Sequence, residues 1–177
     1  FQKDETLDMR FDPSSGGQTA GEMVNNLSAE ELEKIFREYG EEKLSNQIAQ
    51  LIIKKRQIKK IETTQDLVKI AEEAYKYRRG KIHPATKVFQ ALRIAVNDEL
   101  GVLKRVLPEA VESLNAGGRL SVITFHSLED RIVKHYFKGQ DQKTLKIINK
   151  KPIICTDDEC AQNPRARSAK LRTVQKI

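Results

Sequence analysis

The segment GGRLSVITFHSLEDR (117–131) places two reactive side chains directly after a predicted strand. His126 and Ser127 follow a run rich in β-branched residues, and a helical pattern begins after them. An imidazole and a hydroxyl can cooperate in nucleophilic catalysis, but adjacent residues rarely hydrogen-bond as nucleophile and base, and no G-x-S-x-G turn is present. The structural alternative is that Ser127, with Asp130 three residues later, caps the helix while His126 packs.

Ligands of open α/β sheets bind beyond the carboxyl ends of the strands, which keeps His126 and Ser127 as pocket candidates. The nine glycines form neither a G-x-G-x-x-G nor a Walker pattern, so no cofactor-binding residues are predicted within this chain. Cys155 and Cys160 are expected to be free thiols, because their spacing does not suit zinc and no second pair exists. No metal site is predicted.

Helical patterns must position any site in the first part of the chain. Capping boxes predict helix starts at Thr19, Ser28 and Thr63. A long helix is predicted to begin at Pro84 and to run to residue 107. A further helix is predicted to begin at Pro108 and to end at the glycines that follow Asn115.

Three polar residues of the predicted long helix, Gln90, Arg93 and Asn97, share one face beside its apolar stripe. Polar groups in such a position need partners if they are buried. Two interpretations stay open: these residues contact a ligand, or they satisfy the backbone of a loop that packs on the helix. His83, before Pro84, is predicted as an N-cap.

The pattern changes at Gly117, where the segment from Leu120 to Phe125 is predicted as a strand buried on both faces. The order helix, glycine turn, strand, tight turn, helix is typical of a doubly wound α/β sheet. Further strands are predicted at 151–155 and 168–177. Three strands do not complete a parallel sheet, and the first residue is not Met, so we expect an N-terminally truncated α/β domain.

The charge of the chain is unevenly distributed. The formal net charge is +7, and residues 131–177 carry 12 lysines and arginines against 4 acidic residues. A basic segment of this kind favours nucleic acid, with a solvated basic face as the alternative. No apolar run is long enough to cross a bilayer and no secretory signal is visible, so no membrane partner is expected.

Five successive segments together resemble the signatures of one family. They are DETLDMRFDPSSG (4–16), YGEEKLSNQIAQLIIKKR (39–56), KIHPATKVFQALRIAVNDELG (81–101), GGRLSVITFHSLEDRIVK (117–134) and NPRARSAKLR (163–172). The family is that of the S-adenosylmethionine-dependent small-subunit ribosomal RNA cytosine-N4 methyltransferases, or MraW family. The resemblance implies the distal part of a class I Rossmann-like α/β methyltransferase domain with an inserted all-helical domain. It assigns 1–18 to a loop of the catalytic domain, 19–115 to the helical insert and 116–177 to the distal strands and helix.

The family transfers a methyl group from S-adenosylmethionine to N4 of a cytosine in the decoding region of small-subunit rRNA. The resemblance therefore implies that the partner is this rRNA or the small ribosomal subunit. It places the protein in bacterial cytoplasm or in an organelle, and it leaves a homodimer open. The family's glycine-rich cofactor loop precedes the LDMR motif and is absent here, so we expect the cofactor site to lie largely in a missing N-terminal half. The alternative is a non-catalytic RNA- or ribosome-binding remnant.

Three candidates follow for the catalytic role that this reaction requires. The exocyclic amine of cytosine is a poor nucleophile, so methyl transfer needs alignment and an acceptor for the amine hydrogens. Asp8, Asp12 and Asn97 are the predicted catalytic groups, although both aspartates could instead form caps and turns. The predicted substrate pocket consists of Gln90, Arg93, His126 and Ser127.

Basic side chains in two regions are predicted to contact RNA phosphates, which positions the RNA without reading its bases. The predicted contacts are Arg79, Lys81, Arg165, Arg167, Lys170 and Arg172, with Lys54, Lys55 and Arg56 as further candidates in the helical region. Arg165 and Arg167 would share one face of an extended chain. As an alternative, the tail arginines would pair with core carboxylates such as Glu129 and Asp130.

Overall fold

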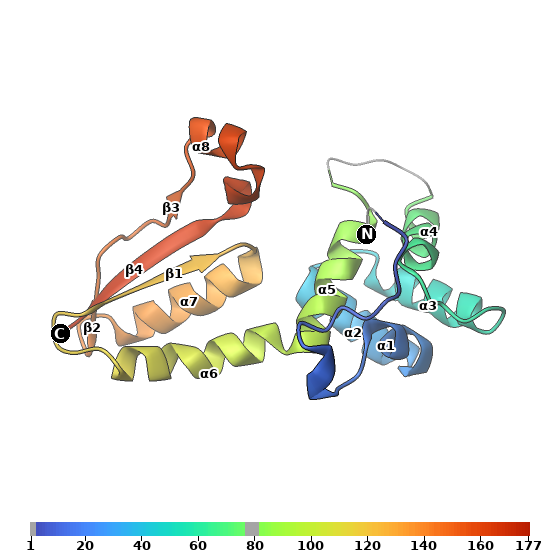
Figure 1. Ribbon diagram of the computed structural model, residues 1–177, viewed down its shortest axis with the longest axis horizontal. Helices are drawn as coiled ribbons and strands as arrows, with labels where there is room; N and C mark the ends of the chain where they lie inside the picture. Colours follow the sequence, from blue (N-terminus) through green and yellow to red (C-terminus); the bar gives the residue numbers. More distant parts are fainter. Residues whose placement is uncertain (1–2, 77–81) are drawn as a thin grey trace. The chain divides into compact units, whose positions relative to one another are not determined.

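The computed structural model describes residues 3–76 and 82–177, which divide into two units, Phe1–Glu99 and Leu100–Ile177 (Figure 1). The first unit is helical and the second combines helices with a sheet, so the chain is a mixed α/β protein. The sequence predicts a helical region up to residue 115, whereas the division into units falls before its last helix. None of the helices described has the length and apolar character needed to cross a bilayer.

The first unit is built from helices that are joined by short loops. After a 3₁₀ turn, η1 (Pro13–Ser15), come α1 (Ala20–Asn26), α2 (Ala29–Gly40), α3 (Ser45–Arg56), α4 (Thr64–Ala74) and α5 (Ala85–Asn97). The capping boxes predicted at Thr19, Ser28 and Thr63 are confirmed, because each hydroxyl accepts from the N3 amide while the N3 carboxylate accepts from the cap amide. The cap predicted at His83 is wrong by one residue, because Pro84 is the N-cap of α5 and the helix begins at Ala85. His83 lies one residue before the cap, and its Nδ1 accepts from Ala85 N at 3.2 Å.

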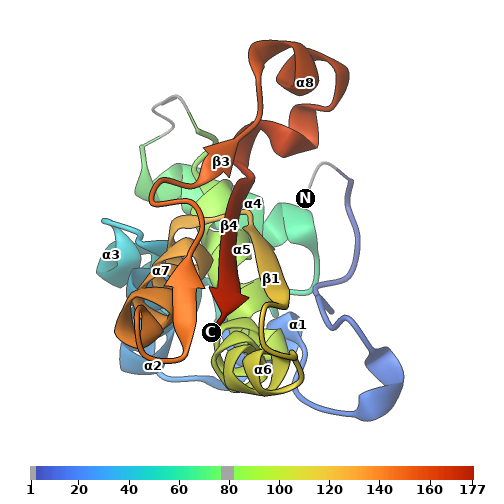
Figure 2. The same ribbon diagram turned by 90° about the vertical axis from the view of Figure 1, so that its left-hand side faces the viewer.

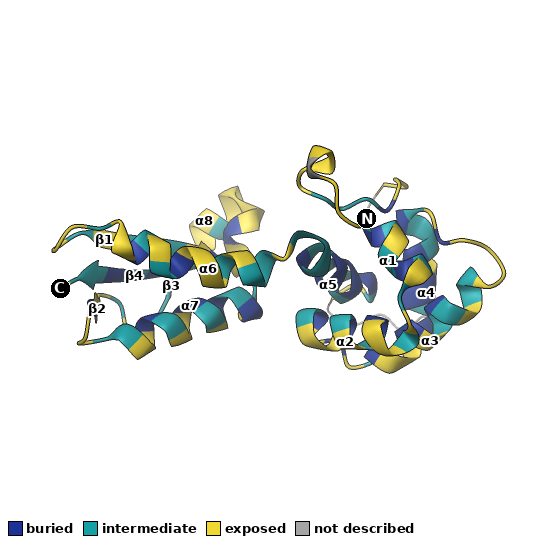
Figure 3. Ribbon diagram, turned by 90° about the horizontal axis from the view of Figure 1, so that it is seen from below, coloured by how far each residue is buried: buried dark blue, intermediate teal, exposed yellow. Residues whose placement is uncertain are grey.

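The core of the first unit lies between the inner faces of these helices (Figure 3). Its largest fully buried side chains include Phe36 of α2, Ile48 and Ile52 of α3 and Leu92 of α5. Helices α2 and α5 approach closely at Gly40, where a Cβ atom would lie 2.8 Å from the carbonyl oxygen of Lys87. That separation is too short for a side chain, which explains a glycine at the end of α2.

The second unit packs two helices against one face of a small sheet. Its elements are α6 (Glu99–Glu112), β1 (Arg119–Thr124), α7 (Ser127–Gln140), β2 (Leu145–Ile147), β3 (Ile153–Ile154), α8 (Asp157–Gln162), a second 3₁₀ turn η2 (Pro164–Ser168) and β4 (Lys170–Lys176). Strand β4 lies between β1 and β2 and also pairs with β3 (Figure 2). Leu107, Val133, Phe137 and Val174 are central to the core under the sheet.

Two predictions about the strands are wrong. All pairings among the strands described are antiparallel, not the parallel pairings of a doubly wound sheet. Strand β1 is not buried on both faces. Leu120 and Val122 pack on the core, whereas Ile123, on the opposite face, is 58% exposed. The reason is that β1 is hydrogen-bonded only to β4 within the described sheet and is covered by helices on one face.

The predicted long helix is divided by a residue that sequence periodicity does not reveal. Asp98 adopts a left-handed conformation with φ 47°, which ends α5, and α6 begins at the next residue. Aspartate tolerates this region better than most residues. The helix predicted to begin at Pro108 does not start there, because Pro108 lies inside α6.

The prediction of free thiols is also wrong, since Cys155 and Cys160 form a disulfide. Helix α8 begins between them and turns the chain so that both sulfur atoms meet. The helix has no buried residue, and all of its residues but Cys160 are exposed (Figure 3).

Candidate functional site

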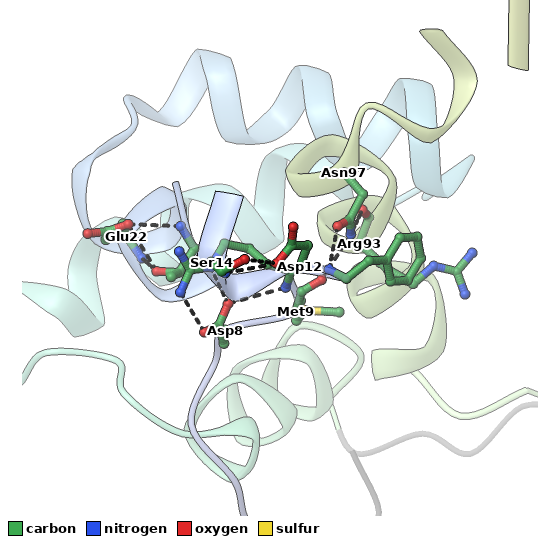
Figure 4. A network of polar contacts seen from close by, with 10 residues as sticks. Asp8, Met9, Asp12, Ser14, Glu22, Arg93 and Asn97 are labelled. Carbon is green, nitrogen blue, oxygen red and sulfur yellow. Dashed lines mark hydrogen bonds and ion pairs between the residues drawn. The ribbon is translucent and has the colours of Figure 1, made fainter. Parts of the chain in front are cut away.

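The loop that follows Leu7 is held against α5 by the side chain of Asn97 (Figure 4). Its Oδ1 accepts from Phe11 N at 2.8 Å, and its Nδ2 donates to the carbonyl oxygens of Met9 at 2.9 Å and Arg93 at 2.8 Å. Met9 has φ 65°, a conformation that costs energy for a side chain of this type. Asn97 therefore positions the loop, and its polar atoms are all engaged in that task.

Asp8 is paired with Arg10 at the start of the same loop. Arg10 Nε donates to Asp8 Oδ1 at 2.6 Å and Nη2 donates to Oδ2 at 2.9 Å, a bidentate ion pair. The Arg10 guanidinium lowers the pKa of Asp8 to about 2. A carboxylate with that pKa is a weak base, so this pairing does not support the predicted catalytic role of Asp8.

Asp12 lies two residues beyond Arg10 and is exposed. Its Oδ1 accepts from the amide and the hydroxyl of Ser14, at 2.9 and 2.6 Å, and so caps η1. The neighbouring Phe11 side chain is 72% exposed although its backbone is fixed by Asn97. The loop thus presents an aromatic ring and a carboxylate side by side in sequence on a constrained backbone.

The two other polar residues of α5 serve packing contacts. Arg93 forms a bidentate pair with Glu99, with Nε to Oε1 at 2.7 Å and Nη2 to Oε2 at 3.0 Å. Gln90 Nε2 donates to the carbonyl oxygen of Tyr39 at 3.1 Å, which joins α5 to α2. Asn97 satisfies the backbone of a packed loop, and Gln90 bonds the backbone at the end of α2. Arg93 fits neither interpretation in full, because its partner is a side chain and its own side chain is 41% exposed.

His126, at the end of β1, is the N-cap of α7, a position the sequence assigns to Ser127. Its Nδ1 accepts from Glu129 N at 3.4 Å, and the Glu129 carboxylate accepts from the amides of His126 and Phe125. Ser127 is exposed and is the first residue of the helix. The predicted Ser127–Asp130 capping box is therefore wrong by one residue, because an imidazole nitrogen accepts as the cap.

Asp130 instead joins α7 to β4. Arg172, of which 8% is exposed, donates to Asp130 Oδ1 at 2.7 Å and Oδ2 at 3.2 Å, and Lys170 Nζ lies 3.3 Å from Oδ2. The hydrogen bonds from Arg172 lower the pKa of Asp130. The alternative of a core ion pair is thus the correct one for Arg172, and its predicted phosphate contact is not supported.

The remaining basic candidates divide by exposure. Arg165 and Arg167 are exposed, but they belong to η2, so the predicted extended backbone is wrong for this pair. Lys55 pairs with Glu73 at 2.7 Å. Arg56 donates to the carbonyl oxygens at the end of α1. Arg79 and Lys81 lie outside the residues that the structure describes.

Sequence reasoning missed Arg10 and Phe11, although the spacing Asp-Met-Arg-Phe-Asp contained a signal for both. A carboxylate two residues before an arginine in a loop allows a local bidentate pair, here between Asp8 and Arg10. Asp12, two residues beyond Arg10, is the more exposed of the two aspartates. Near this loop the Asp8 carboxylate accepts from Arg10, and the Glu22 carboxylate accepts from the amide of Thr19.

Comparison with known proteins identifies the family. A profile of the MraW methylase family matches residues 1–177. The chain is 50% identical to the "Ribosomal RNA small subunit methyltransferase H" of Synechocystis sp. over 179 residues, 49% identical to that of Borrelia hermsii and 46% identical to that of Heliobacterium modesticaldum. Each alignment covers 100% of this chain and 57%, 60% and 62% of the relative, so the chain spans about three fifths of their length. The chain belongs to the MraW methylase family.

Proposed function

We propose that this chain is part of an enzyme that transfers a methyl group from S-adenosylmethionine to N4 of a cytosine in small-subunit rRNA. The names of its relatives support an rRNA methyltransferase. In this proposal the sheet unit is the distal part of a Rossmann-like domain and the helical unit recognises substrate. The small ribosomal subunit or its RNA is the partner, in the cytoplasm of a bacterium, and most of the cofactor site lies outside these residues.

The observation that carries this proposal is the loop from Asp8 to Asp12, clamped by Asn97. We assign catalysis to Asp12, because its carboxylate is exposed and directly follows Phe11 on the backbone that Asn97 holds. The Asp12 carboxylate would accept a hydrogen of the cytosine amine, which directs the nitrogen lone pair towards the methyl donor. The exposed Phe11 ring would stack on the base and hold the amine at that carboxylate.

A chimera tests the proposal. The part of the Synechocystis relative that precedes the matched region is fused to this chain, and the product is incubated with methyl-labelled cofactor and small ribosomal subunits. Nucleoside mass spectrometry, which separates N4-methylcytidine from C5- and ribose-methylated cytidine, should detect the N4 product. Methylation at another atom, or none with RNA binding retained, would contradict the assignment, and the second result would favour a non-catalytic RNA-binding module.

The Asp12→Asn variant of the chimera tests the residue. Asparagine keeps a side-chain oxygen for the Ser14 amide, so η1 remains capped while the negative charge is lost. Loss of a general base should lower kcat by about 100-fold or more. The control is Asp158→Asn, an exposed acidic residue of α8, which should leave the rate unchanged.

A further inference from the structure

A pocket of about 320 Å³ lies in the first unit where α3 leads into α4. Its apolar lining comes from three isoleucines: Ile61 and Ile70 are buried, whereas Ile58 is 80% exposed. The backbone of Ile61 is fixed on both sides by Asn25, whose Oδ1 accepts from Ile61 N at 3.1 Å and whose Nδ2 donates to Ile61 O at 2.7 Å. The floor is therefore held in place by the fold.

Lysines surround this floor. Lys59, Lys60 and Lys69 are exposed and line the pocket. Both lining carboxylates are already engaged. Glu73 pairs with Lys55 at 2.7 Å, whereas Asp66 accepts from the amides of Glu62 and Thr63 and lies 3.8 Å from Lys59 Nζ. Within residues 3–76 and 82–177, neither Lys60 nor Lys69 has a carboxylate at ion-pair distance, so the rim is positive.

Lys60 and Ile61 also line a neighbouring concavity of about 240 Å³. Its other lining residues include Asp8, at the start of the proposed catalytic loop, and the carboxylates of Glu22 and Glu62.

Apolar side chains beneath a cationic rim match the chemistry of one nucleotide, whose base has an apolar face and whose phosphate is anionic. The volume lies within the usual range of about 300–1,000 Å³ for ligand pockets. A base can enter such a concavity only after leaving a helical stack. We propose that this pocket holds one unpaired nucleotide of the RNA substrate, an inference that rests on the proposed function in taking RNA as the ligand.

Anisotropy titrations of the 177-residue chain with a labelled single-stranded RNA, at several salt concentrations, test this inference. Replacing two phosphate-contacting lysines in the variant Lys60→Gln/Lys69→Gln should reduce the slope of log affinity against log salt by about 1.4, at about 0.7 per contact. Ile58→Ser should weaken binding several-fold with the slope unchanged. The control Lys34→Gln/Lys43→Gln removes two exposed charges from the same unit and should retain the slope.

The outcomes distinguish failure of the proposed RNA substrate from failure of the pocket assignment alone. If the unmodified chain does not bind RNA, the RNA substrate is wrong for this chain and the pocket assignment fails with it. If the chain binds RNA and both double variants behave alike, the pocket alone is overturned. The pocket assignment would also be overturned if the chain bound a duplex more tightly than its single strand. Displacement of the RNA by an acidic peptide of the same net charge would overturn it as well.

Discussion

Arg172 of β4 and Asp130 of α7 form a bidentate ion pair in which the two side chains are only 10% and 12% exposed. In Arg172→Met the largely buried Asp130 carboxylate loses its bidentate partner and keeps only the longer contact to the half-exposed Lys170, so the free energy of unfolding should fall by about 3 kcal/mol. The double variant Asp130→Leu/Arg172→Met should recover most of that loss. Urea unfolding of the four proteins in a double-mutant cycle measures the coupling, and additive losses would contradict the pair's importance.

Asn97 should prove to be a positioning residue. In Asn97→Ala the amide of Phe11 and the carbonyl of Met9 lose their partner, which should cost about 1–2 kcal/mol of stability. The released loop should be cut faster by trypsin after Arg10. Asn26→Ala, at the exposed end of α1, is the control; equal cleavage rates in the two variants would show that Asn97 does not hold the loop.

Acid should weaken the protein through Asp8 as well as Asp130. The folded pKa of Asp8 is about 2, below its ordinary value of 3.8, and that of Asp130 is also lowered. Both carboxylates therefore stabilise the fold above pH 3.8, and the contribution is lost as pH falls through the folded pKa values. For Asp8 the window is pH 3.8 to about 2. Carboxyl NMR titration measures its pKa directly, and a value near 3.8 would refute the pairing with Arg10.

Two glycines should respond oppositely to alanine. At Gly40 the added Cβ would meet the Lys87 carbonyl oxygen at 2.8 Å and Ala91 Cβ at 3.3 Å, so Gly40→Ala should destabilise the protein by about 1–3 kcal/mol. At Gly139 of α7 nothing lies within 4 Å, and the gain in helix propensity should stabilise by about 0.5–1 kcal/mol. Thermal unfolding of both variants measures the two changes in stability. An unchanged stability of Gly40→Ala would mean that α2 and α5 can move apart without cost.

The cap of α7 can be assigned by substitution. His126→Ala removes the acceptor for Glu129 N and should cost about 1 kcal/mol, whereas Ser127→Ala should stay within about 0.5 kcal/mol. Chemical denaturation measures both changes. The reverse order would restore the capping box that the sequence alone suggests.

Local signals in the sequence predicted local structure well. The hydroxyl caps at Thr19, Ser28 and Thr63 were predictable because donor and acceptor lie three residues apart. The left-handed Asp98 and the imidazole cap at His126 were not, since other residues usually fill these positions. The exposure of Ile123 depends on which strands neighbour β1, and the partner of Arg172 lies 42 residues away. Such relationships arise only from tertiary pairing.

Within the candidate site, the sequence identified the loop from Asp8 to Asp12 but not the separate roles of its residues. Asp8, Asp12 and Asn97 appeared equivalent as polar candidates, because nothing in a linear pattern shows that Arg10 folds back on Asp8. Only side-chain geometry distinguishes Asp8, which forms a bidentate ion pair with Arg10, from Asp12, which caps η1 and is exposed.

Strand β4 is the partner of β1, β2 and β3, and all three precede it in the chain. During synthesis, none of these pairings can form until β4 has been made. Residues 121 and 173, which meet across the sheet, are 52 positions apart, so pairing also requires a long loop to close. The helical unit can fold as it emerges, whereas these strand pairings form only after Lys170–Lys176 has been made, near the end of the chain.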